Sequence, residues 1–261
     1  MINFLKTLYI HLRIKIQRPF VKFTYVLNQK IYFQISSKKE YYYRFRDSFV
    51  SEKTTMYWIE NIINPDEVVW DIGANVGAYS LLIGSIMNSK NSNGIVYSFE
   101  PESSNFNSLN RNVQLNNLSQ YILPISIAFS NQLKLTKFFL SSIETGSATH
   151  SIDHPYSDGT YFSPKYVQGV FCSSINDFVN TPGVLFPNHI KIDVDGVELD
   201  IVNNMATVLK DDRLRSVVIE VDTSNSNGVI EKLFFDSNFK IFMEESWVSS
   251  EKTITNYIFK K

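Results

Sequence analysis

The 261-residue chain has little of several features that would place it in a special class of protein. It holds one cysteine, Cys172, which excludes an internal disulfide and is typical of a reducing compartment. No apolar run reaches the roughly 18 to 20 residues that a membrane-spanning helix needs. The first apolar stretch is interrupted by bases and lacks a small-residue cleavage site, so it does not resemble a signal peptide. We therefore expect a cytoplasmic protein.

An excess of charge of one sign is also missing, because 25 basic residues nearly balance 26 acidic ones. A net charge of −1 argues against a nucleic-acid-binding protein, since phosphate recognition needs a surplus of bases. The balance is uneven, however: residues 1–53 carry a net charge of +8 and the remainder carries −9. We expect the basic segment to contact an anionic acceptor or an anionic membrane surface, and in the second case the protein would be peripherally membrane-associated.

Short apolar segments alternate with helical patterns along most of the chain. Strands are expected at residues 67–72, 95–100, 122–128, 189–194 and 216–221, with helices at 76–87, 103–116, 199–208 and 229–235. This alternation predicts an α/β fold with a Rossmann-like, doubly wound and mainly parallel sheet. Two last strands, at 239–243 and 253–259, leave little room for a helix between them and predict an antiparallel edge pair at the C-terminus.

Two segments do not follow this alternation. Residues 1–50 are expected to form an N-terminal extension, with an amphipathic helix over 2–19 and a β-hairpin around Asn28, before a domain of residues 51–261. Extra strands at 135–140 and 166–171 flank a long polar loop. A loop of that length is usually functional or disordered.

The turn after the first parallel strand carries the most informative motif, Asp71-Ile-Gly-Ala-Asn-Val-Gly-Ala-Tyr-Ser. Gly73 is expected to let the backbone approach a ligand closely, and Gly77 to let the following helix pack against the strand. Asn75 stands where many nucleotide-binding loops have glycine, and asparagine tolerates the left-handed conformation that such a turn needs. Such a turn alone can be purely structural, but together with an acid at the end of the next strand it predicts a nucleotide-like ligand.

Acidic residues end two further strands, Glu100 on the second and Asp193 on the fourth. Because ligands of open α/β sheets bind beyond the carboxyl ends of the strands, these acids should lie near Asp71. An acid at the position of Glu100 is suited to the ribose hydroxyls of an adenosine-type ligand. The G-x-x-x-G spacing with Asp71 before it disfavours the pyrophosphate of NAD and favours the cationic S-adenosylmethionine.

At this point the residues resemble the FkbM-type methyltransferases. Besides the turn motif, the likeness is carried by Tyr97-Ser-Phe-Glu-Pro-Glu, by Ser174-Ile-Asn-Asp-Phe and by Ile190-Lys-Ile-Asp-Val-Asp-Gly-Val-Glu-Leu. The resemblance implies a class I methyltransferase fold and an S-adenosylmethionine-dependent enzyme that methylates a hydroxyl of a sugar, as in polysaccharide biosynthesis. It also implies that the cofactor is held by Asp71, Gly73, Ala74, Asn75, Gly77, Ser80, Glu100, Pro101, Ala128 and Asp193.

A sugar hydroxyl is a poor nucleophile, so a base within hydrogen-bond reach would assist the transfer. Asp193 is the first candidate for base or acceptor orienter, and His150 and His154 in the polar loop are the second. The sequence His150-x-x-Asp153-His154 also contains common metal ligands, but its spacing is not specific, and we assign no metal.

Two other functions compete with methyl transfer. An NAD(P)-dependent sugar oxidoreductase or epimerase would use a Tyr-x-x-x-Lys pair, but in Tyr161 to Lys165 the intervening Pro164 breaks the required helix. A non-catalytic nucleotide-binding module is the other alternative. For the methyltransferase, the acceptor is expected to be a small molecule or glycan, such as a nucleotide- or lipid-linked sugar. We expect the basic segment and the polar loop to bind it jointly, so that a chain without residues 1–48 would keep the cofactor and lose acceptor methylation.

Overall fold

The computed structural model describes residues 9–13, 19–157, 160–194, 196–226, 228–249 and 252–261, and its centre is a seven-stranded sheet of order β14-β15-β13-β12-β3-β4-β5. The strands from β13 to β5 are parallel, and β15 is antiparallel to both its neighbours. The predicted Rossmann-like sheet with an antiparallel pair at its C-terminal edge is confirmed. The strands are β3 (Val68–Ile72), β4 (Ile95–Phe99), β5 (Ile122–Ile125), β12 (His189–Ile192), β13 (Ser216–Asp222), β14 (Lys240–Ser249) and β15 (Lys252–Lys260).

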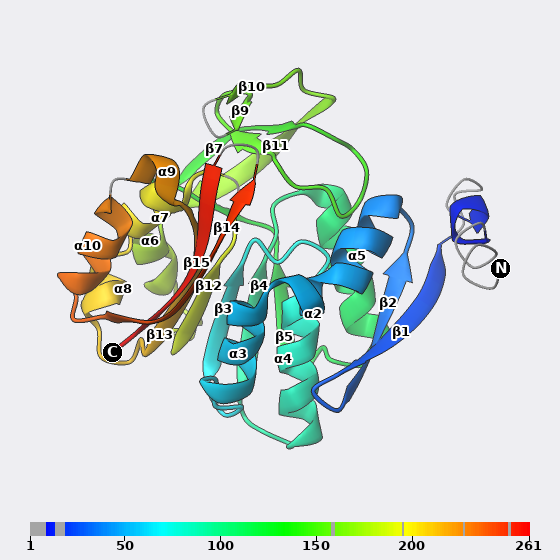
Figure 1. Ribbon diagram of the computed structural model, residues 1–261, viewed down its shortest axis with the longest axis horizontal. Helices are drawn as coiled ribbons and strands as arrows, with labels where there is room; N and C mark the ends of the chain where they lie inside the picture. The colour runs from blue at the N-terminus through cyan, green and yellow to red at the C-terminus, as the bar shows by residue number, and fades with distance from the viewer. Residues whose placement is uncertain (1–8, 14–18, 158–159, 195, 227, 250–251) are drawn as a thin grey trace.

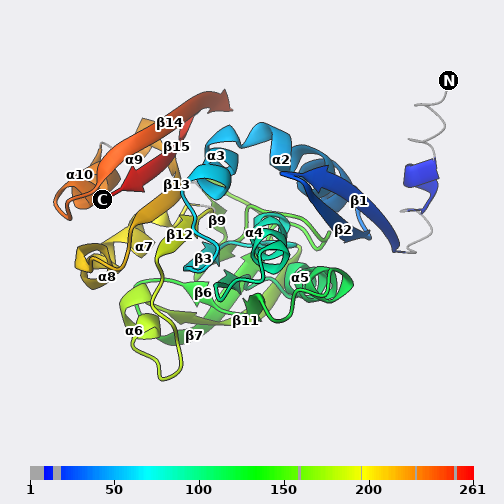
Figure 2. The same ribbon diagram turned by 90° about the horizontal axis from the view of Figure 1, so that it is seen from below.

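Helices cover both faces of this sheet, as Figure 2 shows. Strand residues alternate between the faces: Val69 and Val96 pack on one side, Trp70 and Tyr97 on the other. The first side is covered by α3 (Lys53–Asn61), α4 (Ala78–Ser89) and α5 (Ser103–Leu115). The second is covered by α6 (Ile175–Val179), α7 (Glu198–Asn203), α8 (Ala206–Lys210) and α10 (Val229–Phe235). The single helix predicted over 199–208 is therefore two helices.

The N-terminal segment adds a hairpin to the first side, with strands β1 (Phe20–Val26) and β2 (Gln29–Ile35), at the right of Figure 1. Leu27 and Asn28 form its two-residue turn with φ of 45° and 62°, so the predicted hairpin is confirmed. Side chains of β2 are buried against α4 and α5. On the free edge of β2, backbone N–H groups donate to side-chain oxygens of α5 and its C-cap, Asn112 and Asn116, over 2.8 Å each. The hairpin is thus bonded to the helices that cover the central sheet.

An insertion between β5 and β12 forms a second sheet, of order β6-β11-β7-β8, at the top of Figure 1. Its strands are β6 (Ala128–Phe129), β7 (Lys134–Leu140), β8 (Ser151–Ile152) and β11 (Tyr166–Ser173), and β9 (Tyr156–Ser157) pairs with β10 (Thr160–Tyr161) beside it. The strand predicted over 122–128 is wrong at its end. A tight turn, in which the N–H of Ile127 donates to the carbonyl of Ile125, diverts the chain from β5 into β6.

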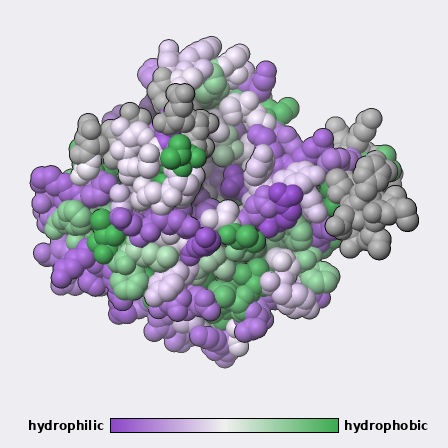
Figure 3. Space-filling view, in the orientation of Figure 1, coloured by the Kyte–Doolittle hydropathy of each residue, from purple (hydrophilic) through white to green (hydrophobic). Residues whose placement is uncertain are grey.

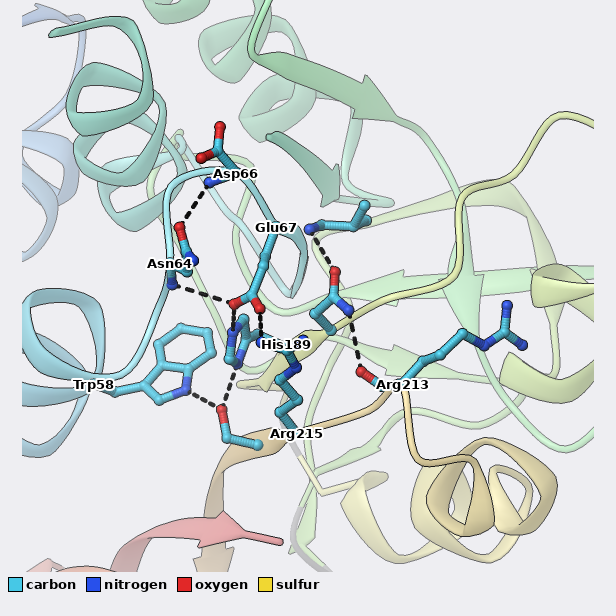
Figure 4. A network of polar contacts seen from close by, with 10 residues as sticks. Trp58, Asn64, Asp66, Glu67, His189, Arg213 and Arg215 are labelled. Carbon is cyan, nitrogen blue, oxygen red and sulfur yellow. Dashed lines mark hydrogen bonds and ion pairs between the residues drawn. The ribbon is translucent and has the colours of Figure 1, made fainter. Parts of the chain in front are cut away.

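A buried polar network joins the amino ends of the central strands to α3 (Figure 4). His189 lies between the carboxylate of Glu67, 2.5 Å from Nε2, and the hydroxyl of Ser216, 2.7 Å from Nδ1. Trp58 of α3 donates to the same hydroxyl over 2.8 Å, and Arg215 pairs with Glu67. Burial lowers the pKa of His189, so its ring is neutral at pH 7. Although a serine, a histidine and a carboxylate stand in a row, His189 and Ser216 are closed to solvent, and the network is structural.

No helix in the described ranges is long and apolar enough to cross a membrane. On the face shown in Figure 3, hydrophobic residues gather near the centre, over α2 (Ser48–Ser51) and α4, within a largely hydrophilic surface.

Candidate functional site

A cavity of about 770 Å³, its open mouth included, lies at the carboxyl ends of β3, β4 and β12. We call it the edge cavity. The tips of these strands, the segment after β5, the insertion and one residue of the N-terminal segment form its walls. Seven of the residues predicted to bind the cofactor or catalyse line it, namely Gly73, Asn75, Glu100, Pro101, Ala128, His150 and Asp193. The predicted residues Asp71, Ala74, Gly77, Ser80 and His154 are not part of its lining.

The turn between β3 and α4 has the left-handed conformation predicted for Asn75, with φ of 52°. Each of its two glycines has a packing role in the structure. A Cβ on Gly73 would lie 1.9 Å from the carbonyl oxygen of Asp193, so this glycine lets the tips of β3 and β12 approach one another. A Cβ on Gly77 would lie 2.5 Å from Cδ1 of Leu109, so this glycine lets α4 pack on α5 and not on the strand.

Asp71 is buried behind the cavity wall. Its Oδ2 accepts a hydrogen bond from the hydroxyl of Ser80 over 2.5 Å, and that hydroxyl also lies 2.6 Å from the hydroxyl of Ser98. Burial raises the pKa of Asp71, against the opposing effects of the Lys191 ammonium and the Ser80 hydroxyl. Ser80 therefore supports Asp71 from within the core. The acids that face the cavity are Glu100 and Asp193.

Glu100 follows β4, and each of its carboxylate oxygens is held by a backbone N–H. The N–H of Asn75 donates to Oε2 and the N–H of Glu102 donates to Oε1, over 2.8 Å each. Burial raises the pKa of Glu100 to about 7, although both N–H groups act in the opposite direction. Each oxygen keeps a lone pair for a further donor. The site thus offers a fixed carboxylate to a ligand with neighbouring hydroxyls.

Apolar side chains also line the cavity. Pro101 follows Glu100, Ile127 to Phe129 follow β5, and Phe138 of β7 and Ile152 of β8 come from the insertion. Phe99 and Phe129 are in edge-to-face contact at 4.9 Å between ring centroids. Flat apolar walls next to a hydroxyl-binding carboxylate suit a heteroaromatic base attached to a sugar.

Asp193 follows β12 and is paired with Lys191, whose Nζ lies 2.6 Å from its Oδ2. Lys191 is almost fully buried, whereas about a third of the Asp193 side chain is exposed. Burial works against the charge of Asp193, but the ammonium holds the pKa of this carboxyl below its ordinary value. Burial also works against the charge of Lys191, and the carboxylates of Asp193, Glu52 and Asp71 together raise the pKa of Lys191. Asp193 is therefore an ionised carboxylate at pH 7 and a weak base.

Other polar groups surround this pair, and the sequence analysis missed them. Glu52 precedes α3, and its burial raises the pKa of this acid while Lys191 lowers it. The ring of Tyr79 lies 5.0 Å from Nζ of Lys191, and its hydroxyl donates to the carbonyl of Ser48 over 2.7 Å. The sequence did contain a signal for Lys191, which lies within the apolar strand segment Ile190-Lys-Ile. A lysine in a sheet that is covered on both faces is buried and needs a charged partner.

The two loop histidines occupy different environments. His150 is buried and lines the cavity with the apolar residues of the insertion. His154 is exposed. Asp153, from the same sequence motif, is held by Lys134 over 2.5 Å and by Thr136 over 2.6 Å. No group of three or more histidines, cysteines or acids that could hold a metal occurs in the described part of the chain.

Arg44 brings a cation from the N-terminal segment to the edge cavity. It belongs to η1 (Glu40–Asp47), a π-helix formed by the aromatic cluster, and its Nε donates to the carbonyl of Gly146 over 3.1 Å. No ion pair of Arg44 with a described carboxylate is present in the structure, whereas Arg46 on the same helix is paired with Asp47. The sequence indicated a role for this basic segment but not which arginine faces the site.

Hydrogen bonds connect the polar loop of the insertion to both the N-terminal segment and the turn motif. The hydroxyl of Ser37 donates to the carbonyl of Thr145 over 2.6 Å, next to the contact made by Arg44. One residue further, the carbonyl of Ser147 accepts hydrogen bonds from the side chains of Asn75 and Asn105, over 2.9 and 3.1 Å. The loop therefore covers the cavity at the turn that the sequence analysis singled out.

Comparison with known proteins shows the family of the chain. The sequence model of the methyltransferase FkbM domain matches residues 71–242, about two thirds of the chain. The chain belongs to the FkbM methyltransferase family. Within curated proteins it is 24% identical over 172 residues to the hexuronic acid methyltransferase AglP of Haloferax volcanii. That match covers 66% of this chain and 63% of the relative, so the chain spans less than two thirds of that protein's length.

The chain is also similar to solved structures of methyltransferases. The methyltransferase FkbM from Methylobacillus flagellatus KT has 14% sequence identity and a TM-score of 0.46, with 75% of this chain and 45% of that chain covered. The tRNA m1G37 methyltransferase of M. jannaschii has 12% identity and a TM-score of 0.48, with 92% and 56% covered.

Proposed function

We propose that this FkbM-family member is an S-adenosylmethionine-dependent O-methyltransferase that acts on a sugar-type acceptor. The observation that carries the cofactor assignment is Glu100, a buried carboxylate that faces the edge cavity next to its apolar part. Such an arrangement matches the ribose and base of an adenosine, and the cavity continues to Gly73, Asn75 and Asp193 for the amino-acid end. When bound there, the cofactor supplies an electrophilic methyl group.

Asp193 lines the same cavity where the amino-acid end and the methyl group of the cofactor would lie, and there it orients the acceptor. An S-adenosylmethionine held at Glu100 and the turn after β3 would supply its methyl group to the acceptor oxygen, and the proton of a hydroxyl acceptor would pass to Asp193 or to solvent. An ionised carboxylate that accepts the hydrogen bond of that hydroxyl aligns the oxygen for in-line attack. Lys191 keeps Asp193 ionised and in place through their ion pair. Positioning, more than strong base catalysis, is the role that this environment supports.

A carboxylate is a second candidate for the accepting group. It needs no base, and Arg44 lines the same cavity with no described carboxylate in an ion pair with it. A planar guanidinium binds a carboxylate through two parallel hydrogen bonds. The name of the Haloferax relative, a hexuronic acid methyltransferase, is in line with a sugar that carries such a group. Methyl transfer to 4-nitrophenyl β-glucuronide and 4-nitrophenyl β-glucoside separates the two candidates, because a methyl ester is labile to base and a methyl ether is not.

Replacement of Glu100 by glutamine should weaken binding of S-adenosylhomocysteine roughly 10- to 150-fold, or about 1.5 to 3 kcal/mol, because hydrogen bonds to an ionised carboxylate are lost. Binding should also depend on pH in the wild type. Since ribose hydroxyls donate to the ionised form and the pKa of free Glu100 is about 7, affinity should increase as pH rises through 7 and level off above it. Isothermal titration calorimetry between pH 6 and 8.5 measures both effects.

Glu60, an exposed acid on α3, provides the matched control: Glu60→Gln should bind as the wild type does. The same calorimetric titrations are carried out with NAD and NADP. Binding of either dinucleotide without binding of S-adenosylhomocysteine would contradict the proposed function.

Replacement of Arg44 by methionine should raise the acceptor KM about tenfold or more, because a charge-assisted, bidentate contact is removed. The affinity for S-adenosylhomocysteine should change less than threefold. Arg46→Met is the control, since Arg46 lies on the same helix, is exposed and pairs with Asp47. A loss of cofactor affinity with unchanged acceptor KM would assign Arg44 to the cofactor's carboxylate and not to the acceptor.

A further inference from the structure

His150 lines the edge cavity and holds a buried polar atom, Nε2, whose environment does not suit the use as a base that the sequence suggested. Only 8% of the residue is exposed, and it lines the cavity together with Phe138 and Ile152. Its ring meets that of Phe138 edge to face, with 5.7 Å between centroids. The Nε2 atom is buried and has no hydrogen-bond partner in the described structure.

The protonation of this ring follows from its other nitrogen. The backbone N–H of Ser141 donates to Nδ1 over 3.3 Å, so Nδ1 is the acceptor and the proton of the neutral ring is on Nε2. Burial lowers the pKa of His150 to about 4, which keeps the ring neutral at pH 7. His150 therefore presents a buried N–H donor with nothing to receive its hydrogen bond. Such donors are rare in proteins and point to a missing ligand acceptor.

The position of His150 identifies the part of the ligand that supplies the acceptor. Glu100 marks the place of the ribose hydroxyls, and His150 lines the same cavity together with apolar residues of the insertion. The base attached to that ribose would therefore lie against these apolar residues. An adenine ring has nitrogen acceptors on its edges and requires apolar contacts on its faces, which Pro101 and Ala128 to Phe129 can provide.

We propose that His150 is the adenine-recognition residue of this protein, donating a hydrogen bond from Nε2–H to a ring nitrogen of the cofactor's base. This assignment rests on the proposed function, since it requires an adenosine-type cofactor. The insertion would then select the cofactor as well as cover it, because His150, Phe138 and Ile152 all come from it. The loop is anchored for this purpose by the bonds from Asn75 and Asn105 to Ser147.

The test uses the full chain and isothermal titration calorimetry with S-adenosylhomocysteine and its 1-deaza, 3-deaza and 7-deaza analogues, each of which replaces one ring nitrogen by C–H. For the wild type, one analogue should bind about tenfold more weakly than S-adenosylhomocysteine, as expected for a buried hydrogen bond. His150→Phe should bind S-adenosylhomocysteine about tenfold more weakly and should lose the discrimination between it and that analogue. His150→Gln, whose amide places an N–H donor near the position of Nε2, should recover part of the affinity.

His154→Phe is the control, because this exposed histidine belongs to the same loop and should bind all four ligands as the wild type does. Equal affinity of the wild type for S-adenosylhomocysteine and all three analogues would overturn the assignment, and this measurement needs no variant to fold. An analogue penalty that persists unchanged in His150→Phe would overturn it as well. Failure of the wild type to bind S-adenosylhomocysteine at all would instead overturn the proposed function, and the assignment with it.

Discussion

Asp193→Asn should reduce the rate of methyl transfer by about 10²- to 10⁴-fold while changing the affinity for S-adenosylhomocysteine far less. The substitution keeps the shape of the side chain and removes the charge that orients the acceptor. It also leaves the amide as a poorer hydrogen-bond acceptor for a hydroxyl. Single-turnover methylation isolates this step, and calorimetry measures cofactor binding on the same preparation.

The ion pair with Lys191 complicates this measurement, because the variant leaves a buried ammonium with less compensation. The carboxylates of Asp71 and Glu52 remain near it and moderate the loss. A control is Asp153→Asn, which breaks a lysine–aspartate pair of similar length with the more exposed Lys134 on the insertion, away from the cavity lining. Thermal unfolding of both variants separates stability from chemistry. Single-turnover rates within threefold of the wild type for Asp193→Asn would exclude Asp193 as base and as orienter.

Deletion of residues 1–48 should destabilise the whole protein, contrary to the expectation that cofactor binding would persist. The hairpin buries Ile31, Phe33 and Ile35 against α4 and α5, and each is 1% exposed or less. Burial of such side chains contributes about 1.5 to 3 kcal/mol each, so their loss approaches the 5 to 15 kcal/mol that typically stabilises a domain. A fall of the unfolding midpoint by about 10 to 30 °C, or loss of a cooperative transition, is expected in calorimetry.

Point variants on the two faces of the same hairpin test whether its buried face stabilises the protein. Phe33→Ala should destabilise the protein by about 3 to 5 kcal/mol, because a large side chain leaves a cavity in the core. Phe23→Ala on the outer face, where the residue is 50% exposed, should change the stability by about 0.5 kcal/mol or less. A truncated chain that unfolds at the wild-type temperature and still binds S-adenosylhomocysteine would show that the hairpin is an independent appendage.

The role of the N-terminal segment is therefore tested by Arg44 and not by truncation. Arg44 lines the edge cavity, whereas the hairpin before it stabilises the fold. A boundary at residue 50 remains a prediction of the sequence pattern. In the structure, bonds from the hairpin backbone to Asn112 and Asn116 run across that boundary.

Local patterns in the sequence were sufficient to predict the parallel sheet, its antiparallel edge pair and the meeting of Glu100 and Asp193 at one edge. The spacing of apolar residues along the chain distinguishes strands from helices. The carboxyl ends of parallel strands necessarily share one edge of the sheet. The left-handed conformation of Asn75 followed in the same way from the residues that such a turn accepts. These features depend on short segments whose pattern is local.

Only the tertiary structure decided which side chains complete the site. Arg44 and Gly146, or Asn75 and Ser147, lie far apart in the sequence, and no period relates them. Two histidines of one sequence motif have different environments: His150 has a buried N–H, and His154 is exposed to solvent. Asp71 is buried in the core and does not face the cavity. The ammonium of Lys191 keeps Asp193 ionised. Charge state and direction of a side chain follow from what packs around it, and irregular loops provide that packing without a pattern that the sequence reveals.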